Sequence, residues 1–495
     1  MFVAAHEWTL PPQKVASPAS PCGQTPASAH GIRQLYESLS TGRADEAVKQ
    51  QAIDFLQHTL HQVQGLPSDL PPTPQGLSAW VQASVQSASA RYRAYLEERK
   101  AGGPRRYFTN RAHALYFLRA VAPTKLVDGA WLYGLLAHAG NPRFSNLIAT
   151  YVEELGEGRA DKNHVLLYRR LLERHGLTPV QDLPEDFYTQ GVLQLALGLN
   201  AGRFLPEVIG FNLGYEQLPL HLLITAYELN ELGLDPYYFT LHITVDNADT
   251  GHAQRAVQAV FDTLPQWGGH EDFWQRVCNG SKLGSVGVGT TEAIQGFDIG
   301  REVVSVLARK SVTGQGAHSD YCRVAGRSIN DWLAGPGNIP DFLKALEQAG
   351  WIKRGAAPRE SRFWKLLEGD KAEMFGVFSP YELQLIHDWI RGDASADGQA
   401  YDEPALGRRR ASFRSLSRQA QPLGSLANPG LLKVLEDSPD DCGMLDLDLQ
   451  ALQAELAVNS SPEAQKRLLV SAMSPWMHWT PAGLHATRRF LQTSI

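Results

Sequence analysis

One stretch of the chain combines acidic side chains with a histidine at helical spacing. Residues 151–172 read YVEELGEGRADKNHVLLYRRLL, and within them Glu157, Asp161 and His164 follow one another at steps of four and three. Glu154 precedes this series by three positions. If the stretch is a single helix, the three-residue series shares one stripe, and Glu154 lies on a neighbouring face. Such a stripe is either a solvated acidic face or a source of metal ligands.

A second cluster lies in the segment LHITVDNADTGHAQRAV. His242 and Asp246 are four positions apart, and Asp249 and His252 follow at steps of three. Leu, Ile and Val flank the first pair, so burying that pair without a partner or an ion would be costly. These residues are therefore either the polar side of an amphipathic helix or further metal ligands.

Two further acids stand alone in apolar helical sequence. Asp128 lies in APTKLVDGAWLYGLL, and Glu216 lies in GFNLGYEQLPLHLL. A single buried acid is usually a hydrogen-bonded structural residue. Here, however, four segments of one predicted bundle each offer carboxylate or imidazole groups that could face inward. Such a set, without thiolates, is typical of a non-haem di-iron or di-manganese centre.

The composition of the 495-residue chain excludes several other classes of protein. Its four cysteines are widely separated and include no CxxC pair, so neither a zinc ribbon nor a disulfide scaffold is expected. Lys and Arg number 46 against 52 Asp and Glu, and the net charge of −6 offers no basic face for nucleic acid. Because no long apolar run and no secretory signal are present, we expect a cytoplasmic protein without nucleic-acid or membrane partners.

The elements that must position these side chains are predicted to be helices. Helical periodicity runs through the middle of the chain with short Gly, Pro and Asn connectors, and strand-like alternation is scarce. The predicted fold class is all-α, with a metal-binding bundle over residues 76–312. Residues 1–75 are expected to form a disordered arm and a helical extension. Residues 313–495 are expected to form an accessory region with a linker near 393–430.

Together, these motifs resemble the haem-oxygenase-like iron-containing oxidases. The resemblance covers about residues 105–310, and it is carried by EELGEG with His164, by VDGAWL, by LGYE and by HITVDNADTGH. This superfamily has the seven-helix fold of haem oxygenase but binds two irons in place of a haem. The resemblance therefore implies a haem-oxygenase-like seven-helix bundle, here with an N-terminal helical extension and a mostly helical C-terminal accessory region.

The resemblance also implies a set of metal ligands. They are Asp128, Glu154, His164, Glu216, His242, Asp246 and His252. The first departs from the family pattern, because Asp128 replaces a glutamate and its carboxylate is one methylene shorter. His252 departs from the family pattern as well, because many members place this histidine where the present chain has Asp249. Either a longer turn presents His252, or Asp249 takes its place.

Two other positions have alternatives. Some members use a shorter spacing between the motif glutamate and its histidine, which would select Glu157 in place of Glu154. We expect Glu154, because both glycines of the motif align with it. Glu207 and Glu228 are rivals of Glu216.

The function implied by the resemblance is that of an iron-dependent oxygenase or oxidase. Two Fe(II) ions, or one, would activate O2 for N-oxygenation, C–H hydroxylation or desaturation, or oxidative C–C cleavage. The substrate would be a small amino-acid-like or amine-containing metabolite, as in natural product biosynthesis. An external electron donor and a homodimer are further expectations. The alternative is a non-catalytic helical scaffold that has lost part of the metal site, which the departures at Asp128 and Asp249 favour.

Overall fold

The computed structural model describes residues 31–177, 183–245, 251–369, 371–392 and 446–493. Helices dominate these residues, which confirms the predicted all-α class. Among them, strand pairing is limited to a two-residue antiparallel hairpin of β1 (Arg323–Val324) and β2 (Arg327–Ser328). None of the helices in these ranges is both long enough and apolar enough to cross a membrane.

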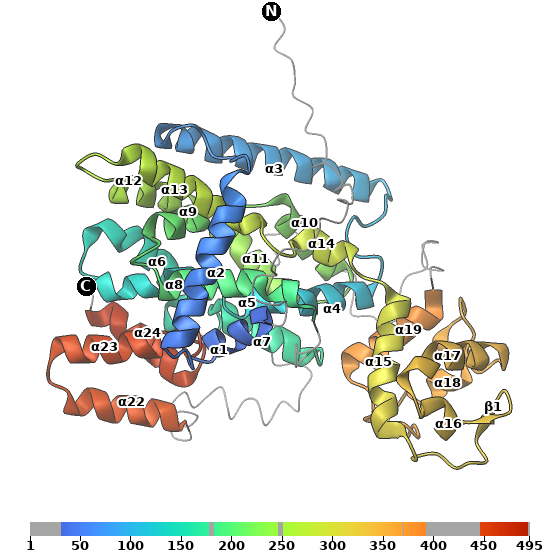
Figure 1. Cartoon of the computed structure of the whole chain (residues 1–495). Helices are drawn as coiled ribbons and strands as arrows, with labels where there is room; N and C mark the ends of the chain where they lie inside the picture. The colour runs from blue at the N-terminus through green and yellow to red at the C-terminus, as the bar shows by residue number, and fades with distance from the viewer. Residues whose placement is uncertain (1–30, 178–182, 246–250, 370, 393–445, 494–495) are drawn as a thin grey trace, which may run out of the picture.

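The main body is a bundle whose helices run in several directions (Figure 1). Its N-terminal helices are α1 (Ile32–Ser40), α2 (Glu46–Gln64) and α3 (Leu77–Lys100). The helices of the first half of the bundle are α4 (Arg111–Ala120), α5 (Ala122–Lys125), the 3₁₀ helix η3 (Ala130–His138), α6 (Ser145–Glu154) and α7 (His164–Arg174). Those of the second half are α8 (Thr189–Leu199), α9 (Leu205–Tyr215), α10 (Leu220–Glu231), α11 (Tyr237–Val245), α12 (His252–Thr263), α13 (His270–Lys282) and α14 (Thr290–Gln295).

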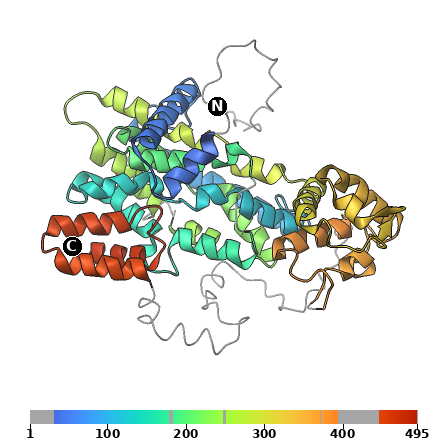
Figure 2. The ribbon, with the colours of Figure 1, turned by 60° about the horizontal axis from the view of Figure 1, so that its bottom comes forward.

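Two further groups of helices lie at opposite ends of this body (Figures 1 and 2). One group has its own apolar core and comprises α15 (Ile299–Gly314), α16 (Ile329–Leu333), α17 (Ile339–Gln348), α18 (Arg362–Lys365) and α19 (Pro380–Arg391). The other group packs on the bundle and comprises α22 (Leu447–Val458), α23 (Pro462–Ala472) and α24 (Pro481–Thr493). Short 3₁₀ turns connect many helices: Pro74–Gly76, Pro142–Phe144, Gly156–Gly158, Glu185–Tyr188, Leu283–Ser285, Pro336–Asn338 and Pro358–Glu360. The domain boundaries at residues 75 and 312 stay predictions.

Glycines allow the bundle helices to touch backbone to backbone. A Cβ on Gly210 of α9 would collide with the carbonyl oxygen of Val277 on α13. A Cβ on Gly198 of α8 would likewise collide with the carbonyl oxygen of Ala130 on η3. These contacts set the positions of α9 and η3. Two predicted ligands lie beside these elements, Glu216 directly after α9 and Asp128 shortly before η3.

The prediction of a single helix over residues 151–172 is wrong. Helix α6 ends at Glu154, and α7 begins only at His164, where the side chain of Asn163 accepts a hydrogen bond from the Leu166 amide at 2.9 Å. Between them, three consecutive residues, Gly156, Glu157 and Gly158, adopt positive φ and turn the chain, and glycine accepts this conformation without strain. The predicted stripe therefore does not exist.

Candidate metal centre

Asp128 enters the site from the connection between α5 and η3. The next residue, Gly129, has φ of 79°, and a Cβ there would lie 3.0 Å from the Cβ of Glu154. A glycine therefore permits both the turn and the close approach to α6. The Asp128 side chain is buried, and Tyr238 of α11 donates a 2.6 Å hydrogen bond to its Oδ2 atom.

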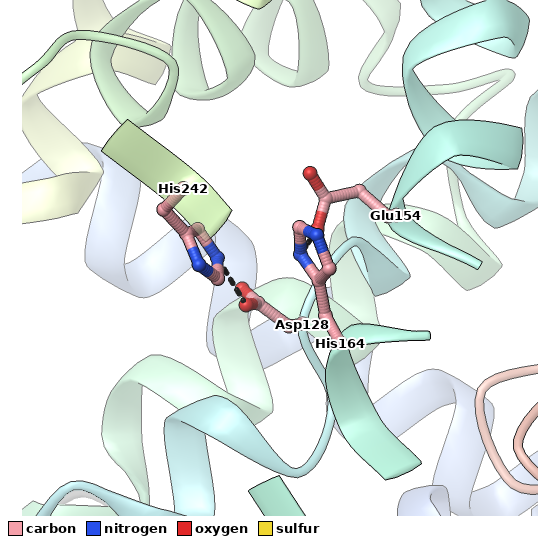
Figure 3. A group of neighbouring side chains, drawn as sticks. All are labelled: Asp128, Glu154, His164 and His242. Carbon is pink, nitrogen blue, oxygen red and sulfur yellow. Dashed lines mark hydrogen bonds and ion pairs between the residues drawn. The ribbon is translucent and has the colours of Figure 1, made fainter. Parts of the chain in front are cut away.

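Four side chains from four parts of the bundle form the first group of candidate ligands. Asp128, Glu154, His164 and His242 each place one ligand atom within 4.8 Å of the others. Nε2 of His242 lies 3.1 Å from Oδ2 of Asp128, and Nδ1 of His164 lies 2.5 Å from Oε2 of Glu154. Figure 3 shows the two histidines side by side, with the carboxylates directed at them.

A second group shares Glu154 with the first. It consists of Glu154, Glu216 and His252, again with ligand atoms within 4.8 Å of one another. Nδ1 of His252 lies 3.0 Å from Oε2 of Glu216 and 3.4 Å from Oε1 of Glu154. Glu154 thus directs one oxygen to each group.

Burial perturbs the protonation of these groups. Desolvation, together with the nearby charges of Asp128 and Glu216, raises the pKa of Glu154 to about 8. Desolvation also lowers the pKa of His164 to about 4. Burial acts to raise the pKa of Asp128, but Lys125 and the two histidines His242 and His164 outweigh it and hold that pKa below its ordinary value. Without a bound cation Glu154 therefore keeps its proton near neutral pH, and a cation in the cluster would favour its ionised form.

The hydrogen bonding of the cluster fits a bound cation. Oε2 of Glu154, Nδ1 of His164 and Oε1 of Glu216 are buried and make no hydrogen bond, although the first two face each other. Native proteins rarely leave buried polar atoms without a partner. Oxygen and nitrogen donors without thiolate suit iron, manganese or zinc. The residues present could therefore hold a metal ion in either group.

The structure brings together six of the seven predicted ligands. They are Asp128, Glu154, His164, Glu216, His242 and His252. The seventh, Asp246, lies outside the described residues, as does its neighbour Asp249. His252 begins α12 after Gly251, which is extended, and it reaches the cluster from that helix.

The carboxylates that were alternatives to the predicted ligands lie outside the cluster. Glu157 is exposed in the turn after α6. Glu207 pairs with Arg276, and the two hydrogen bonds are 2.7 and 2.8 Å long. Glu228 is buried and accepts hydrogen bonds from the Tyr95 hydroxyl and from the backbone amides of residues 106–108. Asp161, from the predicted stripe, is exposed and pairs with Arg159.

The sequence reasoning missed the residues that hold the candidate ligands. Tyr238 binds Asp128 with its hydroxyl, and its carbonyl oxygen lies 2.8 Å from Nδ1 of His242. Tyr238 lies four residues before His242, so the two share one helical face, and this spacing could have indicated the contact from the sequence. Glu153 contacts His252, but its place beside Glu154 gave no sign of that role.

A helical bundle that gathers buried carboxylates and imidazoles from several helices belongs to the class of α-helical proteins that could bind metal in the bundle. Comparison with known families narrows this class, because residues 115–285 match the sequence model of a family described as iron-containing redox enzymes. The match confirms the predicted relationship to the haem-oxygenase-like superfamily and supports an oxidoreductase. All six clustered residues fall within the matched range. Comparisons with curated proteins and with solved structures gave no match.

Proposed function

We propose that the protein is a non-haem di-iron oxygenase or oxidase that activates O2 to oxidise a small amino-acid-like or amine-containing metabolite. The observation that carries the proposal is the position of Glu154, which belongs to both groups of candidate ligands. A shared carboxylate is the arrangement expected of two adjacent metal positions in a helical bundle. The match to iron-containing redox enzymes supports iron as the metal.

Each position would be held by side chains from different helices. Asp128, His164 and His242 would hold one ion, Glu216 and His252 the other, and Glu154 both. Iron(II) bound there would supply electrons for the activation of O2. The three carboxylates would offset most of the charge of two divalent ions. The candidate ligands have little access to water. Even the most exposed of them, His242, has only 11% of its side chain accessible.

Neighbouring residues orient the ligands and fix their protons. The Tyr238 hydroxyl donates to Asp128, and Nδ1–H of His242 donates to the Tyr238 carbonyl oxygen. With its proton on Nδ1, His242 directs the lone pair of Nε2 towards Asp128 and so into the site. Lys125 lies 4.0 Å from Asp128 and contributes a positive charge at the edge of the cluster.

The scaffold alternative is less compatible with these contacts. Without metal, Oε1 of Glu216 would be buried with no hydrogen bond, and Oε2 of Glu154 and Nδ1 of His164 would have only each other as partners. A buried polar atom without a partner typically costs about 1–3 kcal/mol. A protein that had lost metal binding would gain stability by replacing these residues with apolar ones.

Anaerobic Fe(II) titration tests the proposal. We expect the wild-type protein to bind about two equivalents and to show a transient visible absorption when O2 is added. Glu154→Ala should lose both equivalents, because both positions use this carboxylate, whereas Glu216→Ala should retain one. Asp161→Ala removes an exposed acid from the same segment and should bind iron like the wild type. Failure of the wild-type protein to bind iron would refute the proposal.

A further inference from the structure

His252 is held at both nitrogens of its ring. Nδ1 faces the cluster, 3.0 Å from Oε2 of Glu216, while Nε2 lies 2.9 Å from Oε2 of Glu153. The other oxygen of Glu153 accepts a 2.6 Å hydrogen bond from Arg255, one helical turn beyond His252 on α12. The imidazole is only 1% exposed, whereas the Glu153 side chain is 31% exposed at the edge of the site.

This arrangement follows from two consecutive residues of α6. Successive helical residues point about 100° apart, so Glu153 and Glu154 extend on either side of the His252 ring. Oε2 of Glu153 meets Nε2, and Oε1 of Glu154 lies 3.4 Å from Nδ1. One acid therefore lies inside the cluster and the other behind the histidine.

The chemistry of the contacts assigns the proton on the ring. Arg255 can only donate, and its ion pair keeps Glu153 a carboxylate, which can only accept. Nε2 of His252 must therefore carry a hydrogen and donate it to Glu153. In the neutral imidazole, this leaves the Nδ1 lone pair facing Glu216 and Glu154, where two acceptors and a lone pair would repel one another without a cation.

His242 is oriented in the opposite way. Its Nδ1–H donates to the carbonyl oxygen of Tyr238 on the same helix, and its Nε2 faces Asp128. The backbone thus orients the histidine of the first group, and a side chain orients that of the second. Only the second arrangement can be removed by substitution.

We propose that Glu153, anchored by Arg255, is a positioning residue that holds His252 in the Nε2–H tautomer so that Nδ1 can bind the second metal ion. The proposal rests on the proposed function and adds to it the ring nitrogen used and the group that selects it. Removing such a partner of a ligand histidine typically weakens metal binding by about 10–100-fold.

Anaerobic Co(II) titration, followed by visible absorption, tests this role without turnover. We expect the wild-type protein to bind two equivalents. Glu153→Ala should bind the first equivalent normally and the second about 10–100-fold more weakly. Glu153→Gln keeps an oxygen that can accept from Nε2–H but loses the ion pair with Arg255, so it should retain both equivalents.

A matched control variant distinguishes the positioning role of Glu153 from the effect of removing any ion pair. Glu231 is 26% exposed and pairs with Arg99 at 2.8 Å outside the cluster. Glu231→Ala should bind two Co(II) ions like the wild type, and urea unfolding of each variant should show by how much its fold is weakened. If Glu153 only ties α6 to α12, the Gln variant should lose the second ion as fully as the Ala variant.

The outcomes distinguish this inference from the proposed function. Two normal equivalents in Glu153→Ala, or equal losses in the Ala and Gln variants, would overturn the positioning role and leave the proposed function standing. No metal uptake by the wild-type protein would overturn both.

Discussion

Asp128 has three polar neighbours at one oxygen of its carboxylate. Its Oδ2 atom accepts a 2.6 Å hydrogen bond from Tyr238, lies 3.1 Å from Nε2 of His242 and lies 4.0 Å from Lys125. From the sequence alone, this shorter acid favours a weakened metal site. The structure shows instead that neighbouring groups hold it in place and keep its pKa low.

At the residue scale, we expect Tyr238→Phe to weaken metal binding at the first position. The substitution removes the hydroxyl that orients Asp128 but keeps the ring that packs 4.6 Å from the ring of His242. Hydrogen bonds to charged groups are typically worth about 1.5–3 kcal/mol, so an affinity loss of roughly tenfold or more is expected. Isothermal titration with Fe(II) under anaerobic conditions would measure it.

Tyr168→Phe provides the control for that measurement. Tyr168 is also buried, and its ring lies 4.7 Å from that of Tyr238, but its hydroxyl donates to the Leu118 carbonyl oxygen rather than to a candidate ligand. Its removal should lower stability without changing iron affinity. Equal affinities in the wild type and Tyr238→Phe would contradict the orienting role of the hydroxyl.

At the scale of elements, the site depends on how closely helices approach one another. The indole N–H of Trp131 on η3 donates to Asn212 on α9 at 2.9 Å, which ties the element after Asp128 to the helix that precedes Glu216. Helix α9 in turn rests on α13 through Gly210. These contacts link the elements beside Asp128 and Glu216, two candidate ligands far apart in the sequence.

We expect Gly210→Ala to destabilise the fold and to disturb the Glu216 position. The added methyl group would collide with the Val277 carbonyl oxygen, which belongs to a helix backbone and cannot move freely. Overpacking of this kind typically costs about 1–3 kcal/mol. Urea unfolding of the two proteins would measure the loss in the free energy of unfolding.

The same helix offers the matched substitution. A Cβ at Gly214 would meet its nearest atom, the Ser281 carbonyl oxygen, at 3.5 Å, which is an ordinary contact. Gly214→Ala should therefore be neutral or slightly stabilising, since alanine favours the helix by up to about 1 kcal/mol. If Gly210→Ala behaved like Gly214→Ala, the proposed backbone contact would be wrong.

At the scale of the whole molecule, the C-terminal segment packs against α6, the turn after it and the residue that caps α7. The Tyr151 hydroxyl donates to the Met473 carbonyl oxygen at 2.7 Å, and Arg488 donates to the Gly158 carbonyl oxygen at 2.5 Å. His478 is buried beside Asn163, the residue that caps α7 and precedes His164. Segments more than 300 positions apart therefore share one interface.

This interface should make stability depend on pH. Burial and the charge of Arg169 lower the pKa of His478 to about 3, whereas an unfolded histidine titrates near 6.5. Between these values the unfolded chain binds the extra proton, so His478 contributes a loss of stability as the pH falls below about 6.5, of at most about 1.4 kcal/mol per pH unit. His478→Gln should show a shallower loss between pH 6.5 and 5.

Urea unfolding at several pH values, with a metal chelator present, would measure this difference. The chelator removes the contribution of metal binding to stability. His485, which is more exposed and lies on the same C-terminal segment, provides the control, and His485→Gln should follow the wild-type pH profile more closely. Parallel profiles for the wild type and His478→Gln would show that His478 is not the titrating group.

The residue types of the cluster and most of its members could be predicted from the sequence. Carboxylates and histidines within apolar helical segments signal a buried polar cluster, because burial without partners is costly wherever the chain folds. The same local patterns predicted the all-α class, which the structure confirms. The helix predicted over residues 151–172 failed because periodicity does not register a turn with positive φ at Gly156 and Gly158.

The tertiary structure alone decided which groups meet. Helix rotation and crossing decide that Glu154 belongs to both groups and that Glu207 and Glu228 pair elsewhere. They also decide the contacts of Glu153 and Tyr238. These are set by packing between segments distant in sequence. A rotation of one residue about a helix axis, about 100°, moves a side chain from the cluster to the surface. Residue types can therefore indicate metal chemistry, while packing determines which atoms take part.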